Sequence, residues 1–226
     1  MNRRVKSSTF APNLNATVLT LDNGATEYAH VAGAIVWPQY LSIGDVMPGA
    51  VVVGCHSIDD NILRVRDEMQ FNSLTPDMEN GKIKDGLCYF LDRAKKLYNC
   101  TSFFWAGDKD LHRRYRLQMS RNGLYSDFNT MFIRAPYADN QSECNNLIMQ
   151  YNADGLFQIV PDGEIHRQLK MNSDNPVNQN FIQALRVLLA GFERLPWQAP
   201  YEMEIFDMYD HRFGWHEPKP PKQVVC

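Results

Sequence analysis

The chain has 226 residues, 44% of them hydrophobic and 22% charged, which is typical of a globular body rather than of a disordered chain. Its net charge of -3 argues against a general nucleic-acid coat, because affinity for phosphate grows with the number of bound cations. The N-terminus lacks the apolar core of a signal peptide, and no run of about 18 apolar residues predicts a membrane span. We therefore expect a cytoplasmic protein without a membrane partner.

The five cysteines are odd in number and far apart, with no CxxC pair of the kind that closes a zinc knuckle or a redox turn. We expect free thiols in a reducing compartment, and no cofactor. Residues 1–14 and the proline- and lysine-rich residues 217–226 are expected to be tails on a single globular domain at 15–216.

Three turn motifs predict β-hairpins. The first covers about residues 17–32, where Asp-Asn-Gly separates two β-favouring runs and Asn-Gly accepts the positive φ of a tight turn. The second covers about 113–134, where apolar and polar residues alternate before an Asn-Gly pair. The third covers about 155–169, where an apolar run meets Pro-Asp-Gly, a sequence suited to a β-turn.

Apolar residues at helical spacing predict amphipathic helices over about 83–98 and 176–194, with a shorter one over about 140–151. Together with the hairpins they predict an α+β fold, in which a largely antiparallel sheet is covered on one side by two or three helices.

The stretch IFDMYDHRFGWHEP at 205–218 is a candidate catalytic or metal site. On a helix, Asp207, Asp210 and His211 would share one face and could hold an ion. The residues just before it alternate between apolar and acidic, which favours a strand that points Asp210 away from the other two. His211 and His216 could still supply two metal ligands, but a solvated strand end is the favoured interpretation.

The stretch CHSIDDN at 55–61 follows an apolar run that reads as a buried strand. His56 and Asp59 are candidates to assist catalysis from this loop. A Cys55–His56 nucleophile pair is disfavoured, because adjacent strand residues face opposite ways. The acidic residues would also serve as a cap for the segment that follows.

The stretch KDLHRRYRLQMSR at 109–121 is basic within an acidic chain. As the first strand of a hairpin it would carry its guanidinium groups on the face opposite the apolar side chains, and arginine forks pair with phosphate or carboxylate oxygens. An ordinary solvated face is the alternative. The predicted binding residues are Arg113, Arg114, Arg116, Arg121 and the stacking residue Tyr125.

Three functions follow from these motifs. We expect a binding or adaptor protein, rather than an enzyme, that docks on nucleic acid or on an acidic protein through the arginine-rich hairpin. The alternatives are a metal-dependent hydrolase of phosphodiesters that uses the C-terminal Asp/His cluster, and a structural subunit of a larger assembly. The sequence leaves the oligomeric state open.

Overall fold

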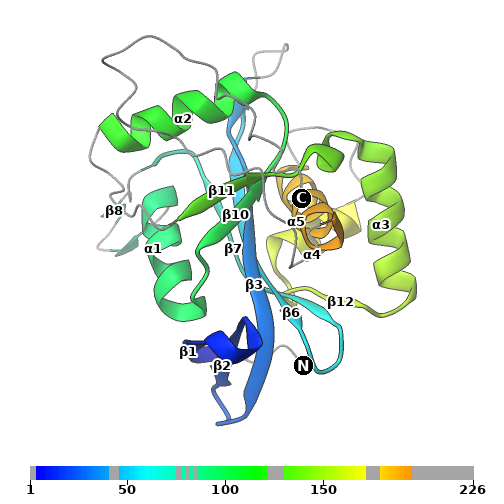
Figure 1. The fold of residues 1–226 in the computed structure, drawn as a ribbon. Helices are drawn as coiled ribbons and strands as arrows, with labels where there is room; N and C mark the ends of the chain where they lie inside the picture. The colour runs from blue at the N-terminus through cyan, green and yellow to red at the C-terminus, as the bar shows by residue number, and fades with distance from the viewer. Residues whose placement is uncertain are drawn as a thin grey trace, which may run out of the picture.

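An eight-stranded mixed sheet is the centre of the computed structural model (Figure 1). The structure describes residues 4–40, 46–74, 78–79, 82–83, 86–121, 130–171 and 179–194. The strands of the sheet are β1 (Val5–Ala11), β2 (Ala16–Leu21), β3 (Thr26–Val36), β6 (Gly49–Ser57), β7 (Leu63–Phe71), β10 (Ser102–Trp105), β11 (Met131–Arg134) and β12 (Phe157–Gln158). Its main path runs β1-β2-β3-β6-β7-β12, and β10 and β11 branch from β3.

Two further strand pairs are short, β4 (Gln39–Tyr40) with β5 (Val46–Met47) and β8 (Met78–Glu79) with β9 (Lys82–Ile83). The helices are α1 (Leu87–Tyr98), α2 (Lys109–Arg121), α3 (Gln141–Ala153), α4 (Glu164–Met171) and α5 (Asn180–Arg194), with 3-10 turns η1 (Pro12–Leu14) and η2 (Pro136–Asp139). None of the helices in these described ranges is long and apolar enough to cross a membrane.

Strand β3 has different partners on its two edges. Along one edge it pairs antiparallel with β6 from residue 29 to residue 36. Along the other edge its first part pairs antiparallel with β2, and its last part pairs parallel with β10. The sheet therefore divides along β3 into a lower arm of β1 and β2 and an upper arm of β10 and β11, as Figure 1 shows.

Helices cover both faces of the sheet. Odd-numbered residues of β6, such as Val51 and Val53, belong to a core with α1 and part of α2, which we call the first face. Even-numbered residues, such as Ala50 and Val52, belong to a core with α3, α4 and α5, the second face. The prediction of helices on one side only is wrong, because the apolar residues of β6 do not alternate with polar ones: Gly49–Cys55 are all buried.

The α+β class and the largely antiparallel sheet are confirmed. The hairpin predicted at about 17–32 is present as β2 and β3, and Asn23 accepts a hydrogen bond from the backbone N–H of Ala25 in its turn. The three predicted helices are present as α1, α3 and α5. Helix α1 begins later than predicted, after Gly86, and 82–83 belong to β9.

The second predicted hairpin, about 113–134, is wrong. Residues Lys109–Arg121 form helix α2, and β11 pairs parallel with β10 instead of returning along the preceding segment. The alternation of apolar and polar residues covers only residues 114–119, which is too short to distinguish a strand from a helix. Over the whole segment Leu111, His112, Tyr115 and Met119 recur at helical spacing, and His112 and Met119 are buried.

The third predicted hairpin, about 155–169, is also wrong. The Pro-Asp-Gly turn does not return into a strand but leads into helix α4, and β12 has only two residues, which pair parallel with β7. Glu68 of β7 explains the helix start, because its carboxylate accepts hydrogen bonds from the backbone N–H groups of Glu164 and Ile165.

Half of the predicted N-terminal tail, residues Val5–Ala11, is strand β1 of the sheet. Strand β1 pairs antiparallel with β2, and Val5 is buried in the core of the first face. The predicted C-terminal tail at 217–226 lies outside the described residues.

Four cysteines are free thiols, as predicted, and all four are buried: Cys55, Cys88, Cys100 and Cys144.

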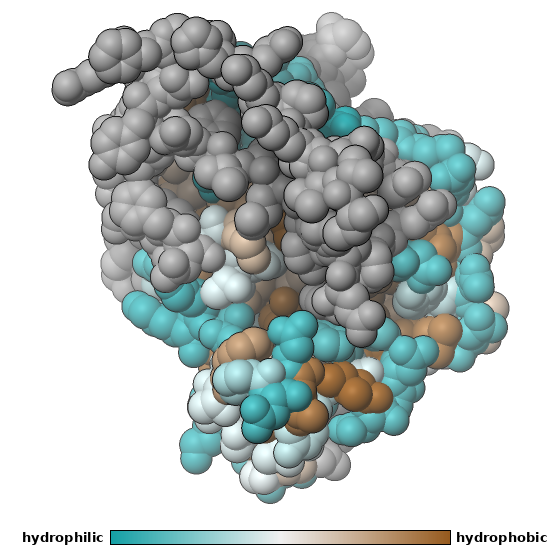
Figure 2. Space-filling view, viewed as in Figure 1, coloured by the Kyte–Doolittle hydropathy of each residue, from teal (hydrophilic) through white to brown (hydrophobic). Residues whose placement is uncertain are grey.

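Figure 2 shows apolar side chains on the lower part of this side of the molecule, where β1, β2 and the turn between β6 and β7 lie. The exposed large apolar residues of this lower region are Phe10, Leu14, Tyr28 and Ile58.

Candidate functional site

The carboxyl ends of the parallel strands β3, β10 and β11 meet at one end of the sheet. In open sheets with parallel strands, ligands bind in the crevice outside such ends. Asp139 joins two of these ends, because it accepts hydrogen bonds from the backbone N–H of Gly107 (2.7 Å) and from the Arg134 guanidinium (2.8 Å). The strand ends are thereby fixed relative to each other.

Helix α2 starts at this end of the sheet and crosses above the end of β3 in Figure 1. Asp108 is its N-terminal cap, since its carboxylate accepts hydrogen bonds from the backbone N–H groups of Asp110 (2.7 Å) and Leu111 (3.2 Å). The capping carboxylate and the helical spacing of apolar residues explain why this basic segment is a helix.

A stack of aromatic rings supports α2 from below. The His112 ring lies 3.8 Å from the Trp105 ring, with only 3° between their planes. The Trp37 indole N–H donates to Nδ1 of His112 at 3.0 Å, and the Tyr115 ring stacks on Trp37 at 4.9 Å. Phe132 of β11 closes the cluster against His112.

The imidazole of His112 is neutral in this stack. Burial, and to a lesser degree the nearby charge of Arg116, lower its pKa to about 3. Because Nδ1 accepts from Trp37, the proton of the neutral ring is on Nε2. His112 therefore acts as a rigid support for the helix rather than as an acid or base near pH 7.

The cationic residues of α2 lie outside the stripe of buried and partly buried side chains formed by Leu111, His112, Tyr115 and Met119. Lys109 and Arg114 are exposed, and Arg113 and Arg116 are half-buried. The Arg116 guanidinium lies 4.2 Å above the Phe132 ring. Three of the predicted binding arginines are thus presented by a helix, and not by the predicted extended ribbon; Arg121 is its last residue.

A cavity of about 410 Å³ lies between α2 and the chain that follows β3. It combines a guanidinium, a carboxylate and two carboxamides with apolar walls. Its lining residues are Pro38, Gln39, Asp108, Leu111, Arg114, Tyr115 and Gln118. Such a mixture suits an organic ligand with a charged group and a flat or apolar part.

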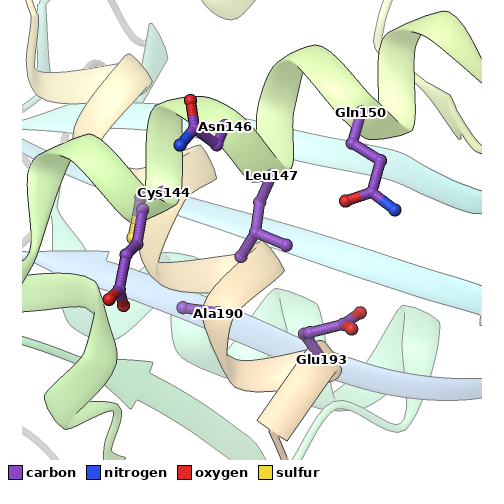
Figure 3. A pocket seen from close by; sticks show the side chains of 7 residues that line it. Cys144, Asn146, Leu147, Gln150, Ala190 and Glu193 are labelled. Carbon is purple, nitrogen blue, oxygen red and sulfur yellow. The ribbon is translucent and has the colours of Figure 1, made fainter.

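A second cavity, of about 300 Å³, lies between α3 and α5 on the second face. Figure 3 shows Asn146, Leu147 and Gln150 along α3, with Ala190 and Glu193 along α5. The Tyr151 hydroxyl donates to the Glu193 carboxylate at 2.8 Å. This cavity has carboxylates and carboxamides but no Lys or Arg side chain among its described lining residues, so its chemistry does not suit an anion.

The other predicted site residues are far from α2 or outside the described ranges. His56 is the half-buried penultimate residue of β6, and Asp59 is exposed in the turn that follows, at the opposite end of the sheet from α2. The C-terminal candidates and the predicted stacking residue lie outside the described residues: Tyr125, Asp207, Asp210, His211 and His216. In the described ranges no group of three or more His, Cys, Asp or Glu side chains could hold a metal ion.

Several residues of the α2 site were not predicted from the sequence. Trp37 and Gln39 come from segments that had no assigned role, whereas His112 and Gln118 lie in the basic segment but were not among its predicted binding residues. The helical spacing of Leu111, His112, Tyr115 and Met119 was the available signal for that helix. Trp37 and Gln39 had no local signal, because they reach the site only through the parallel pairing of β3 and β10.

Comparisons with models of protein families, with curated proteins and with solved structures found no match to this chain.

Proposed function

We propose that the protein binds nucleic acid through helix α2 and the cavity beside it. The observation that carries this proposal is the concentration of five Lys and Arg residues in the 13 residues of α2, in a chain whose net charge is -3. A local cluster of cations in an acidic protein concentrates phosphate binding on one surface instead of spreading it over the whole molecule.

The surroundings of the helix support the same function. The buried stack of His112 on Trp105 holds α2 rigidly, so its exposed side chains start from fixed positions. Arg114 belongs both to the exposed side of the helix and to the lining of the cavity. A phosphate group on Arg114 would bring the attached sugar and base to the wall made by Pro38 and Tyr115.

Binding to fluorescently labelled 20-nucleotide single-stranded DNA, duplex DNA and RNA, measured by anisotropy in 50 mM NaCl, tests the proposal. The double variant Lys109→Glu, Arg114→Glu should weaken binding at least about tenfold and reduce the salt dependence, because phosphate contacts are lost. Both residues are exposed, so the melting temperature should change little.

The matched control is Lys96→Glu, Lys170→Glu, which makes the same change in net charge at exposed positions of α1 and α4. It should leave affinity within about twofold. An equal loss of affinity in both double variants would mean that net charge alone, and not the position of the cations on α2, determines binding. If the unmodified protein binds none of the nucleic acids, the proposal is rejected. If poly-glutamate binds as tightly as the nucleic acids do, the proposed partner would be an acidic protein instead of a nucleic acid.

A further inference from the structure

His30 of β3 and His56 of β6 lie directly opposite each other in the antiparallel pair. Side chains at opposed positions project from the same face, with Cβ atoms about 4.5–5.5 Å apart. Both imidazoles are on the second face, where the His56 ring lies 5.8 Å from the Phe192 ring of α5. Both are half-buried, so an ion from solvent can reach them.

Each imidazole is held by an asparagine in the left-handed conformation. The backbone of Asn15 (φ 46°) accepts a hydrogen bond from His30. The backbone and side chain of Asn61 (φ 59°) accept from His56. Metal-binding histidines commonly donate one ring N–H to an oxygen in this way. The hydrogen bond fixes the ring and the tautomer, so that the second ring nitrogen carries the lone pair that can bind a metal.

The electrostatic surroundings favour a cation. An imidazole with an ordinary pKa near 6.5 is already mostly in the neutral, metal-binding form at pH 7. The carboxylates of Asp60 and Glu193 are near enough to His56 to act on it electrostatically. The same negative charges would attract a divalent ion to the pair.

We propose that His30 and His56 form a two-histidine site for a divalent transition-metal ion such as Zn²⁺, Ni²⁺ or Cu²⁺. Two imidazole nitrogens select these borderline ions over Mg²⁺ and Ca²⁺, which prefer oxygen ligands. Water completes the coordination, because no group of three His, Cys, Asp or Glu ligands exists among the described residues. The site is near the middle of β3, away from the carboxyl end of the strand where α2 lies, and does not depend on the proposed nucleic-acid binding.

Isothermal titration calorimetry of the full chain with ZnCl₂, NiCl₂ and MgCl₂ at pH 7.5 tests the site. The unmodified protein should bind Zn²⁺ and Ni²⁺ with a stoichiometry that includes this site, and should not bind Mg²⁺ there. His30→Ala and His56→Ala should each remove one bound ion or weaken its binding at least about tenfold. His166→Ala changes another partly exposed histidine, on α4, and should have no effect.

A second readout keeps the test independent of folding. In NMR spectra of the unmodified protein, Ni²⁺ should broaden the imidazole resonances of His30 and His56 before those of His166, because paramagnetic broadening requires proximity. His56→Gln, which retains a polar side chain, replaces His56→Ala if that variant does not fold. Unchanged Zn²⁺ binding in both histidine variants, or broadening of His166 first, would overturn the proposal.

Discussion

Two adjacent carboxylates of β7, Asp67 and Glu68, point to opposite faces of the sheet and have different kinds of hydrogen-bond donors. On the first face, the Asp67 carboxylate accepts from the Arg93 guanidinium of α1 at 2.7 Å. On the second face, the Glu68 carboxylate accepts from the backbone N–H groups at the start of α4. A carboxylate can thus be stabilised in a sheet either by a paired cation or by the free N–H groups of a helix end, and adjacent residues of one strand use both.

The packing of the two faces differs as well. The first face is rich in aromatic rings, with Trp37, Trp105 and Phe103 around α2 and β10. The second is lined mainly by small and aliphatic residues of α5, with Phe104 projecting from β10. Each face nevertheless requires a glycine beneath a phenylalanine ring: Gly33 beneath Phe103 and Gly191 beneath Phe104.

The largest effect is expected from a methyl group at these two glycines. In Gly33→Ala the new Cβ would overlap the Phe103 ring and lie 2.9 Å from the Val52 carbonyl oxygen, so we expect a loss of about 3 kcal/mol of unfolding free energy. Gly191→Ala overlaps the Phe104 ring but gains helix propensity, so we expect about 2 kcal/mol. Urea unfolding followed by circular dichroism measures both.

Gly24→Ala is the control for the pair of glycine variants. Nothing lies within 4 Å of its new Cβ, and only the positive φ of 82° opposes the substitution. We expect about 1 kcal/mol. Equal losses in all three variants would mean that backbone conformation, rather than ring packing, sets the requirement for glycine on either face.

An intermediate effect is expected from pH on the first face. The pKa of His112 is lowered to about 3, so between pH 3 and 6.5 the unfolded chain binds more protons than the folded one. The stability that comes from keeping His112 neutral is fully present above pH 6.5 and is lost as the pH falls. We expect the unfolding free energy to have dropped by about 3 kcal/mol at pH 4 for this reason. His112→Asn should lower stability at pH 7 and remove this part of the slope in urea unfolding between pH 4 and 6.5. An unchanged slope would contradict the neutral imidazole.

The smallest effect is expected from pH on the second face, and it has the opposite sign. Burial raises the pKa of Glu68 from 4.5 to about 7, so the folded chain binds more protons in this range and stability falls as the pH rises through it. Glu68→Gln keeps an acceptor oxygen for the α4 amides and removes the charge. The unfolding free energy of the variant, relative to that of the unmodified protein, should be about 1–2 kcal/mol more favourable at pH 8 than at pH 5. This difference is smaller than the full pKa shift would give, because the side chain is partly exposed. The same difference at both pH values would exclude a raised pKa.

Local patterns predicted those parts of the fold whose cause is local. The β2–β3 hairpin follows from a turn of a few residues, and α1, α3 and α5 follow from apolar spacing sustained over three or more turns. Helix α2 was missed because the six alternating residues at 114–119 were given more weight than the longer helical spacing that includes His112. The start of α4 depends on Glu68, which is 96 residues from Glu164 in sequence and gave no local signal.

The candidate sites were predictable only in part. The arginines of α2 were found from charge density, but their presentation on a helix was not. His56 was predicted as a candidate site residue, whereas His30 was not. The two meet only because β3 and β6 pair in a register that aligns residue 30 with residue 56, and register depends on how whole strands pack.

The shared edge of β3 sets an order in which the sheet can be assembled. Strand β2 reaches that edge through a four-residue turn, whereas Phe103 of β10 is 70 residues away in sequence from its partner Gly33. Closing the longer loop costs more chain entropy, so we expect the hairpin to form before β10 pairs with β3. Until then the upper half of β3 has an open edge to which another chain could add, and this interval is where a slowly synthesised or overexpressed copy is most exposed to aggregation.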